Sequence, residues 1–256
     1  MNITQQFREK LVGQKFKTNN CGVCEVIDYE NSQNVTVKFL NPEFTTSVFL
    51  HQLRKGTVRN PFVPSFYGKG YLGEGKYSFK DKRVYDMWCN MLRRVYCELT
   101  RSKFPTYEDV EVYEEWLDFQ NFADWCYSQN SFSLKDNKGR VYQLDKDLLV
   151  KGNKLYSPNT CCFIPKDVNV LLTNNRVNRG ECPLGVSYRG DTGRFQASVS
   201  SNKKSYLGVF DTKEEAFQAY KSAKEFHIKE VAEKWKTGLD EKAYLALLNY
   251  EISIED

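Results

Sequence analysis

The sequence predicts an α+β chain that is made of several small modules. Alternating apolar and polar residues mark short strands near both ends of the chain, as in the runs 34–40 and 194–200. Apolar residues at helical spacing mark helices around 84–95 and 114–128, and again after Thr212. A length of 256 residues suits two or three small domains better than one large core.

Residues 1–58 are predicted to form a small Tudor-like β-barrel. Its strands are CEVIDYE and NVTVKFL, which a turn at 31–34 joins, and TTSVFL, which continues the meander. The aromatic residues Tyr29, Phe39 and Phe44 form either an aromatic binding site or, as is more usual in a small barrel, part of the core. Three roles stay open for this module: contact with a partner protein, contact with nucleic acid, or packing support.

Residues 59–80 contain many glycines, prolines and aromatic residues and lack strong periodicity, which predicts a linker or an extended arm. A free linker has little use for aromatic side chains. We therefore expect this arm to pack along another surface, with Lys69 and Lys76 available for phosphates.

Residues 81–176 are predicted to hold two helices, then a hairpin and a third helix. The hairpin pairs YQLDKDLL, residues 142–149, with LYSPNTCCFIP, residues 155–165. The helix KDVNVLLTNN follows Pro165, and proline is tolerated where a helix begins. A hairpin followed by a helix is the frame of a ββα-metal nuclease site.

Residues 177–236 carry three short alternating runs and then a helix, the most informative pattern of the chain. In the second run Phe195, Ala197 and Val199 form an apolar face that needs cover. The helix supplies apolar residues at helical spacing: Ala216, Phe217, Ala219, Tyr220 and Ala223. Thr212 and Glu215 are predicted to cap its start. The other face of the sheet is polar and open.

Basic residues concentrate in the same region. From Arg176 to Ser205 there are six basic residues against two acidic ones, although the net charge of the whole chain is only +4. A local basic patch is the electrostatic footprint of phosphate binding. A small sheet with one helix behind it and a basic, polar front has a shape that can enter the DNA major groove. The structural alternative is an ordinary solvated polar face.

The tail, residues 237–256, is predicted to be a short helix that packs on the preceding domain and has an acidic end. The N-terminus shows no signal peptide and the chain no transmembrane run, so we expect a cytoplasmic location and no membrane partner. The eight cysteines then favour free thiols over disulfides. Cys21-x-x-Cys24 lacks a second ligand pair at suitable spacing, and no zinc is expected.

The segments GVSYRG, GRFQASVS and YLGVFDTKEEAFQAY resemble the ethylene-response-factor (Apetala-type) DNA-binding domain over about a quarter of the chain. The resemblance implies that outward residues of the three strands contact bases and phosphates of double-stranded DNA. The matching positions are Ser187, Arg189, Arg194, Gln196, Ser198, Ser200, Lys204 and Tyr206. Several arginines of the family are serines here, which bears on base specificity but not on docking in the groove.

A second resemblance covers about a further third of the chain. The words W-x-x-M-x-x-R-x-Y, LDKD and YSPNTCCFIP are similar to those of phage HNH homing endonucleases, in which such a module often precedes an Apetala-type domain. The resemblance implies metal-dependent DNA cleavage by four polar residues: Asp145, Asp147, Asn159 and Asn169. Asp145 and Asp147, two apart on a strand, are the expected ligands of Mg²⁺ or another divalent metal. Lys146 stands where the family has its general-base histidine, and a protonated lysine cannot accept a proton.

These patterns predict a phage-type, double-stranded DNA-binding protein derived from an HNH homing endonuclease. If the central site is active, the protein is a metal-dependent DNA nuclease, a hydrolase that nicks or cleaves. Two other classes stay open. One is a catalytically inactive regulatory protein whose N-terminal barrel binds a partner protein, with the polar hairpin residues as a structural relic. The other is RNA binding, because a basic sheet with an exposed tyrosine can also stack bases.

Overall fold

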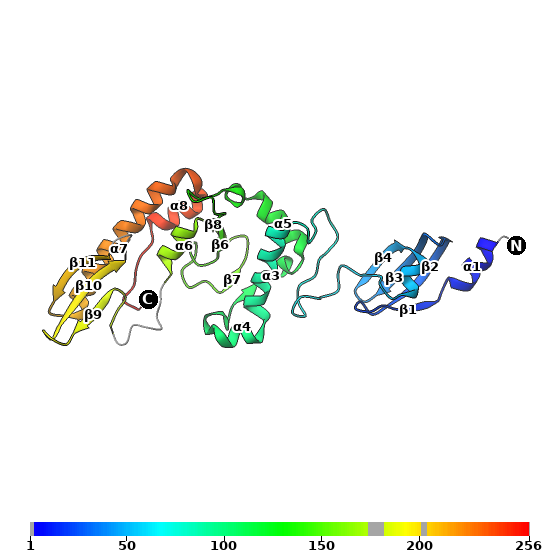
Figure 1. The fold of residues 1–256 in the computed structure, drawn as a ribbon, viewed down its shortest axis with the longest axis horizontal. Helices are drawn as coiled ribbons and strands as arrows, with labels where there is room; N and C mark the ends of the chain where they lie inside the picture. The colour runs from blue at the N-terminus through cyan, green and yellow to red at the C-terminus, as the bar shows by residue number, and fades with distance from the viewer. Residues whose placement is uncertain (1–2, 174–181, 201–203, 256) are drawn as a thin grey trace. The chain divides into compact units, whose positions relative to one another are not determined.

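The computed structural model describes residues 3–173, 182–200 and 204–255, and shows the mixed α+β fold that the sequence predicts (Figure 1). The chain divides into two compact units, Met1–Asp124 and Trp125–Asp256. The division falls inside helix α5 (Phe119–Ser128).

The first unit begins with a helix and a four-stranded antiparallel meander in the order β1-β2-β3-β4. The elements are α1 (Ile3–Leu11), β1 (Lys15–Lys17), β2 (Val23–Asn31), β3 (Asn34–Leu40), β4 (Glu43–Val48) and α2 (Leu50–Arg54). Alternation along β2 and β3 directs Val26, Val37 and Phe39 into the core, where all three are fully buried. Of the two roles open for Phe39, the structure therefore shows the core position. Within the described part of the chain, β1 and β4 each pair with one strand, so the sheet has two edges.

The arm after this sheet packs closely, as its aromatic residues indicated. The Phe62 ring lies between those of Phe44 and Tyr71, at centroid distances of 5.6 and 6.1 Å. The Asn60 side chain donates a hydrogen bond of 2.8 Å to the carbonyl of Pro42. These contacts fix the arm against strand β4.

The helical part of the first unit is built around Trp88. Its elements are α3 (Lys82–Tyr96), α4 (Glu98–Lys103), η1 (Pro105–Tyr107), β5 (Glu111–Val112) and η2 (Glu114–Leu117), followed by α5. Trp88 is fully buried, and its indole N–H donates to the carbonyl of Trp116 at 2.8 Å. A buried indole keeps its hydrogen bond in this way.

The second unit begins with a small hairpin and a helix. Its elements are η3 (Asn130–Ser133), β6 (Gln143–Asp145), β7 (Leu155–Tyr156), β8 (Cys162–Ile164) and α6 (Lys166–Leu172). Strand β6 pairs antiparallel with β8, with Gln143 opposite Ile164. The single strand that we predicted for 155–165 is wrong. The Thr160 hydroxyl donates to the carbonyl of Leu155, and Pro158 has no N–H, so a turn separates β7 from β8.

The C-terminal part is a three-stranded antiparallel sheet backed by one long helix. The elements are β9 (Val186–Arg189), β10 (Arg194–Ser200), β11 (Lys204–Phe210), α7 (Lys213–Trp235), η5 (Lys236–Gly238) and α8 (Glu241–Leu248), and the strand order is β11-β10-β9. Helix α7 covers one face of the sheet, and Ala197, Phe217 and Tyr220 are buried there. Thr212 and Glu215 form the predicted capping box. Helix α8 packs on α7, as expected for the tail.

Candidate nucleic-acid interface and hairpin site

The polar face of the C-terminal sheet gathers most of the residues predicted to contact DNA. Cross-strand pairing sets Ser187 opposite Gln196 and Arg189 opposite Arg194, and residues that pair across strands share a face. Ser198 lies opposite Tyr206, after a bulge between Ala197 and Ser198. The predicted contact residues on this face whose side chains the structure describes are Ser187, Arg189, Arg194, Gln196, Ser198 and Tyr206, and we call them the front face. The apolar Val209 lies opposite Gln196 and shares this side of the sheet.

Ser200 and Lys204 form the last pair of strands β10 and β11. Their side chains lie outside the described residues, as do Arg176 and Arg179 of the predicted basic patch.

Both front-face arginines are held by carboxylates. Arg189 contacts Asp191 through two hydrogen bonds, from Nε at 3.1 Å and from Nη2 at 2.6 Å. Arg194 Nε donates to Asp211 at 2.8 Å. Two arginines directly opposite each other repel, so each carboxylate reduces this repulsion. The hydrogen bond from Arg189 holds the pKa of the Asp191 carboxyl below its usual range.

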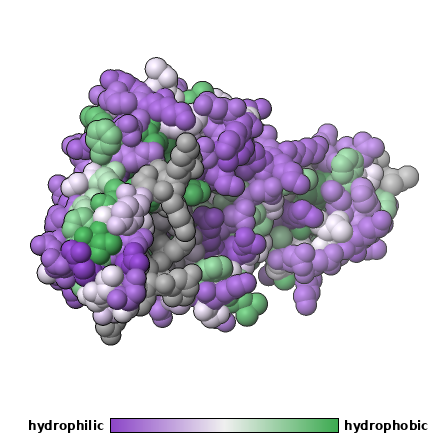
Figure 2. Space-filling model, turned by 60° about the vertical axis from the view of Figure 1, so that its left-hand side comes forward, coloured by the Kyte–Doolittle hydropathy of each residue, from purple (hydrophilic) through white to green (hydrophobic). Residues whose placement is uncertain are grey.

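The front face is accessible to a large partner. Tyr206 is 63% exposed, and all four members of the two ion pairs have side chains at least 41% exposed. Figure 2 turns the end that carries β9–β11 forward and shows a mainly hydrophilic surface with small, separate hydrophobic patches. Ion pairs this exposed are weak, so both arginines can exchange their carboxylates for phosphates.

The hairpin places Asp145 and Asp147 differently from the sequence prediction. Strand β6 ends at Asp145, so Asp147 is no longer on a strand and the two carboxylates do not share a strand face. The Asp145 carboxylate accepts the backbone N–H groups of Asp147 and Leu148, at 2.9 and 2.7 Å. Burial raises the pKa of Asp145, and these two hydrogen bonds act against that rise. Asp145 thus folds the chain into a tight loop after β6.

Lys146 is buried and belongs to the same loop. Its ammonium group donates to Asp147 at 2.5 Å and to the carbonyl of Asn153 at 2.7 Å, and lies 6.0 Å from the centre of the Tyr156 ring. A buried ammonium that donates to two oxygens stabilises the loop and offers no lone pair to a water molecule.

The two asparagines predicted for the site differ in their hydrogen bonds. Asn169, on α6, donates to the side-chain oxygen of Gln143 on β6 at 3.2 Å. Asn159 is exposed in the turn that precedes β8, and no hydrogen bond of its side chain is found in the described part of the chain. Asn169 therefore joins the hairpin to its helix, and Asn159 does not.

In their present arrangement, the carboxylate oxygens of this loop do not fit a divalent metal. One oxygen of Asp145 already accepts two N–H groups, and one oxygen of Asp147 is bound to the Lys146 ammonium. A cation bound between the aspartates meets the positive charge of Lys146, which repels it. Across 3–173, 182–200 and 204–255, no three His, Cys, Asp or Glu side chains form a metal-binding group.

Sequence reasoning missed the residue that shapes the loop. Asn153 donates to the carbonyls of Lys146 and Leu155, at 2.8 and 2.6 Å, and accepts the Leu155 N–H at 3.1 Å. The sequence did contain a signal for a turn at Asn153, because the preceding residue is Gly152 and Gly-Asn is typical of a turn. Asp211 was missed as well, although it follows β11 directly and lies next to the pair Phe195–Phe210.

Both cysteines of the N-terminal Cys-x-x-Cys motif contact the backbone of neighbouring segments. Cys24 is buried, which raises the pKa of its thiol, and its sulfur donates to the carbonyl of Phe16 at 3.7 Å. Cys21 donates to the carbonyl of Asn60 at 3.9 Å. Both thiols thus have backbone partners.

Comparisons of the chain with protein-family models, with curated proteins and with solved structures gave no match. Among the described helices, none combines the length and the apolar character that crossing a membrane requires.

Proposed function

We propose that this protein binds double-stranded DNA through the front face of β9–β11, placed in the major groove. The observation that carries the proposal is the pair Arg189–Arg194, opposite each other on an exposed, polar sheet whose other face is covered by α7. Two-stranded and three-stranded β-structures fit the major groove, where guanidinium groups bind base edges and phosphates.

Two further features support a groove-binding sheet. Gln196 and Ser198 add hydrogen-bonding groups between the arginines and Tyr206, so each of the three strands contributes polar residues to this side of the sheet. The helix that backs the sheet begins at a capped end and is 23 residues long, so the sheet rests on a well-formed support.

The other modules complete the proposal. The hairpin of β6 and β8 followed by α6 corresponds to the ββα frame of a phage HNH homing endonuclease, and the open β1–β4 sheet to the strands of the Tudor-like module. The protein then acts in the cytoplasm of the host cell. Mg²⁺-dependent cleavage stays a prediction, and the present arrangement of Asp145, Lys146 and Asp147 offers it little support.

A second candidate is a DNA-binding regulatory protein without cleavage activity. The observation in its favour is that Lys146 donates to Asp147 and to the Asn153 carbonyl, so that these residues stabilise the loop after β6.

The test combines a mobility-shift assay and a cleavage assay, with duplex DNA and supercoiled plasmid, with and without Mg²⁺ or Mn²⁺. We expect the full chain to shift duplex DNA, and Arg189→Ala with Arg194→Ala to weaken the binding by at least about tenfold, because guanidinium contacts contribute about 1–3 kcal/mol each. Equal affinity of the variant removes the sheet as the DNA-binding surface.

The cleavage arm separates the two candidates. Nicking that needs the metal and is lost in Asp145→Ala identifies a working nuclease. A shift without nicking identifies the regulatory protein. Tighter binding to a single-stranded RNA of matched length than to the duplex favours the RNA alternative.

A further inference from the structure

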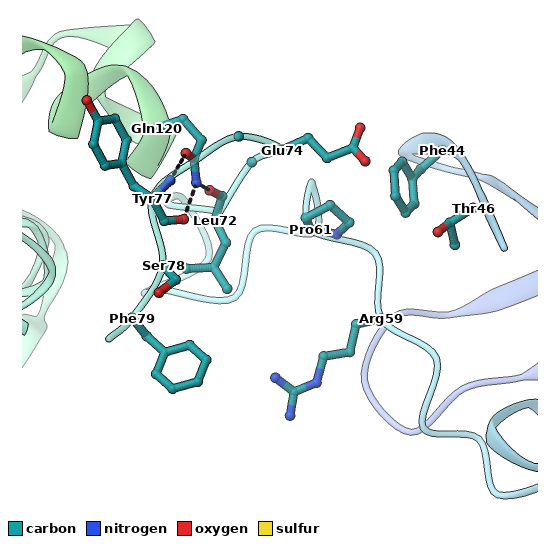
Figure 3. A pocket seen from close by; sticks show the side chains of 12 residues that line it. Phe44, Thr46, Arg59, Pro61, Leu72, Glu74, Tyr77, Ser78, Phe79 and Gln120 are labelled. Carbon is teal, nitrogen blue, oxygen red and sulfur yellow. Dashed lines mark hydrogen bonds between the residues drawn. The ribbon is translucent and has the colours of Figure 1, made fainter. Parts of the chain in front are cut away.

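A cleft in the first unit lies between strand β4 and the loop of residues 72–79 (Figure 3). Its volume is about 310 Å³, which accommodates a few side chains of a peptide better than a large cofactor. The lining residues that matter are Phe44, Thr46, Arg59, Glu74, Tyr77 and Phe79.

The loop wall of the cleft is held in shape by Gln120. This side chain is buried, and its amide group donates to the carbonyls of Leu72 and Tyr77 and accepts the Tyr77 N–H, each at 3.0 Å. A Cβ atom on Gly73 or Gly75 would collide with Asp118 or Gln120, so the loop lies directly on the start of α5. A wall formed before binding lowers the entropic cost of binding.

The opposite wall is a sheet edge. Strand β4 pairs only with β3 in the part of the chain that the structure describes, so it is an edge strand, the position at which another strand can add to a sheet. Phe44 and Thr46 alternate along β4 and line the cleft. The N–H of Gly73 donates to the carbonyl of Pro61 at 3.1 Å, which ties the loop to the arm beside this strand.

Two opposite charges face the cleft. Arg59 and Glu74 are exposed, and over the described ranges neither has a hydrogen bond or an ion pair from its side chain. Figure 3 shows the guanidinium of Arg59 directed toward the side of Phe79, and the carboxylate of Glu74 directed toward Phe44. By contrast, the nearby Lys76 is paired with Asp124 at 3.0 Å. An occupant that carries both charges satisfies Arg59 and Glu74 together.

We propose that this cleft binds an extended peptide segment of a partner protein, which adds to the β4 edge. An acidic side chain of the peptide pairs with Arg59, a basic one pairs with Glu74, and an apolar one packs against the 59%-exposed Phe79. Strand addition supplies main-chain hydrogen bonds, and the pocket supplies specificity. A nucleic-acid strand fits less well, because its phosphates face the Glu74 carboxylate.

The test is a selection from a random library of displayed peptides about ten residues long, a span that covers one strand edge, on the immobilised full chain. Enriched peptides are then titrated against the protein by fluorescence anisotropy. We expect enriched peptides to carry an acidic and a basic residue on either side of an apolar one. Arg59→Glu combined with Glu74→Arg should weaken their binding by at least about tenfold, and peptides with the two charges exchanged should regain it.

The matched control is Arg54→Glu combined with Glu108→Arg, which makes the same charge exchange at exposed positions of this unit outside the cleft. It should bind the peptides as the unmodified protein does, and thermal unfolding should show all three proteins folded. The proposal is overturned if no peptide is enriched, if the exchanged variant binds the enriched peptides equally well, or if single-stranded DNA of random sequence displaces them.

Discussion

At the scale of single residues, Arg140 binds two carboxylates from different parts of the second unit. Its Nε donates to Asp136 at 2.6 Å, and its Nη2 donates to Asp167 at 2.7 Å. Burial acts to raise the pKa of Asp136, but hydrogen bonds from the backbone of Arg140 and Lys138 and from the Arg140 side chain outweigh it, and the pKa is lowered. The hydrogen bond from Arg140 also lowers the pKa of Asp167. Arg140 thus fixes α6 to the loop before β6.

This pairing predicts a pH-dependent stability. A carboxyl group whose pKa is lower in the folded state stabilises the fold above its unfolded pKa of about 4, and the stabilisation is lost as the pH falls through the folded pKa. Arg140→Met should therefore lower the melting temperature at about pH 7, and the difference from the unmodified protein should shrink below about pH 4. Circular dichroism melts across this range measure the effect.

Lys135→Met is the control, because it removes one positive charge from an exposed neighbour of Asp136 that contributes to neither lowered pKa. A melting-temperature difference for Arg140→Met that stays constant down to low pH contradicts the proposed charge linkage.

At the scale of elements, Gly185 sets how β9 meets helix α7. It has a positive φ of 76°, and a Cβ atom there would collide with the ring of Tyr220. Its carbonyl accepts the N–H of Ser198 at 2.9 Å, next to the point where Leu207 of β11 has no partner in β10. This one position therefore joins the edge strand, the central strand and the helix.

Replacing Gly185 by alanine should destabilise the sheet strongly. Left-handed strain and overpacking against Tyr220 together cost about 3 kcal/mol. Gly190→Ala is the matched control, because a Cβ atom at Gly190 meets nothing within 4 Å. Urea unfolding of both variants measures the difference. Similar free energies of unfolding for the two would show that the contact between Gly185 and Tyr220 does not limit packing.

The sequence was sufficient for elements whose periodicity and caps agree. The three strands, the capped helix α7 and the side of the sheet that α7 covers follow from alternation, from Thr212 and from helical spacing. The hairpin site was harder to predict. Period two put Asp145 and Asp147 on one face, but the strand stops where the Asp145 carboxylate accepts two backbone N–H groups. Local side-chain hydrogen bonds of this kind compete with strand pairing and leave no periodic signal.

At the scale of the whole molecule, charge distribution matters more than net charge. The chain carries only +4, and the front-face arginines share the sheet with Asp191 and Asp211. In the proposed complex, these carboxylates compete with DNA phosphates for the same guanidinium groups. The proposal therefore predicts an affinity that depends on local exchange of partners rather than on the total charge.

Asp191→Asn combined with Asp211→Asn should bind duplex DNA more tightly and with a steeper salt dependence. Each additional phosphate contact changes the slope of log K against log salt by about 0.9. Fluorescence anisotropy at several salt concentrations measures both quantities. The control, Glu241→Gln with Glu251→Gln, makes the same change in net charge at exposed positions away from the sheet. Equal gains in the two double variants would mean that net charge alone governs binding.

Helix α7 also limits how evolution can reuse the sheet. Its first turns cover the strands, while its later part carries α8: Tyr244 donates to Glu233 at 2.5 Å, and the N–H of Ile252 donates to Glu225 at 2.8 Å. The Ser131 hydroxyl, in η3, donates a hydrogen bond of 2.6 Å to the Asp240 carboxylate, which lies just before α8. A recombination event that copied only residues 182–236 into another gene would separate buried Trp235 from Tyr142, whose ring lies 6.2 Å from it, and helix α7 from α8. The sheet and its helix are therefore inherited best together with both of these flanking parts.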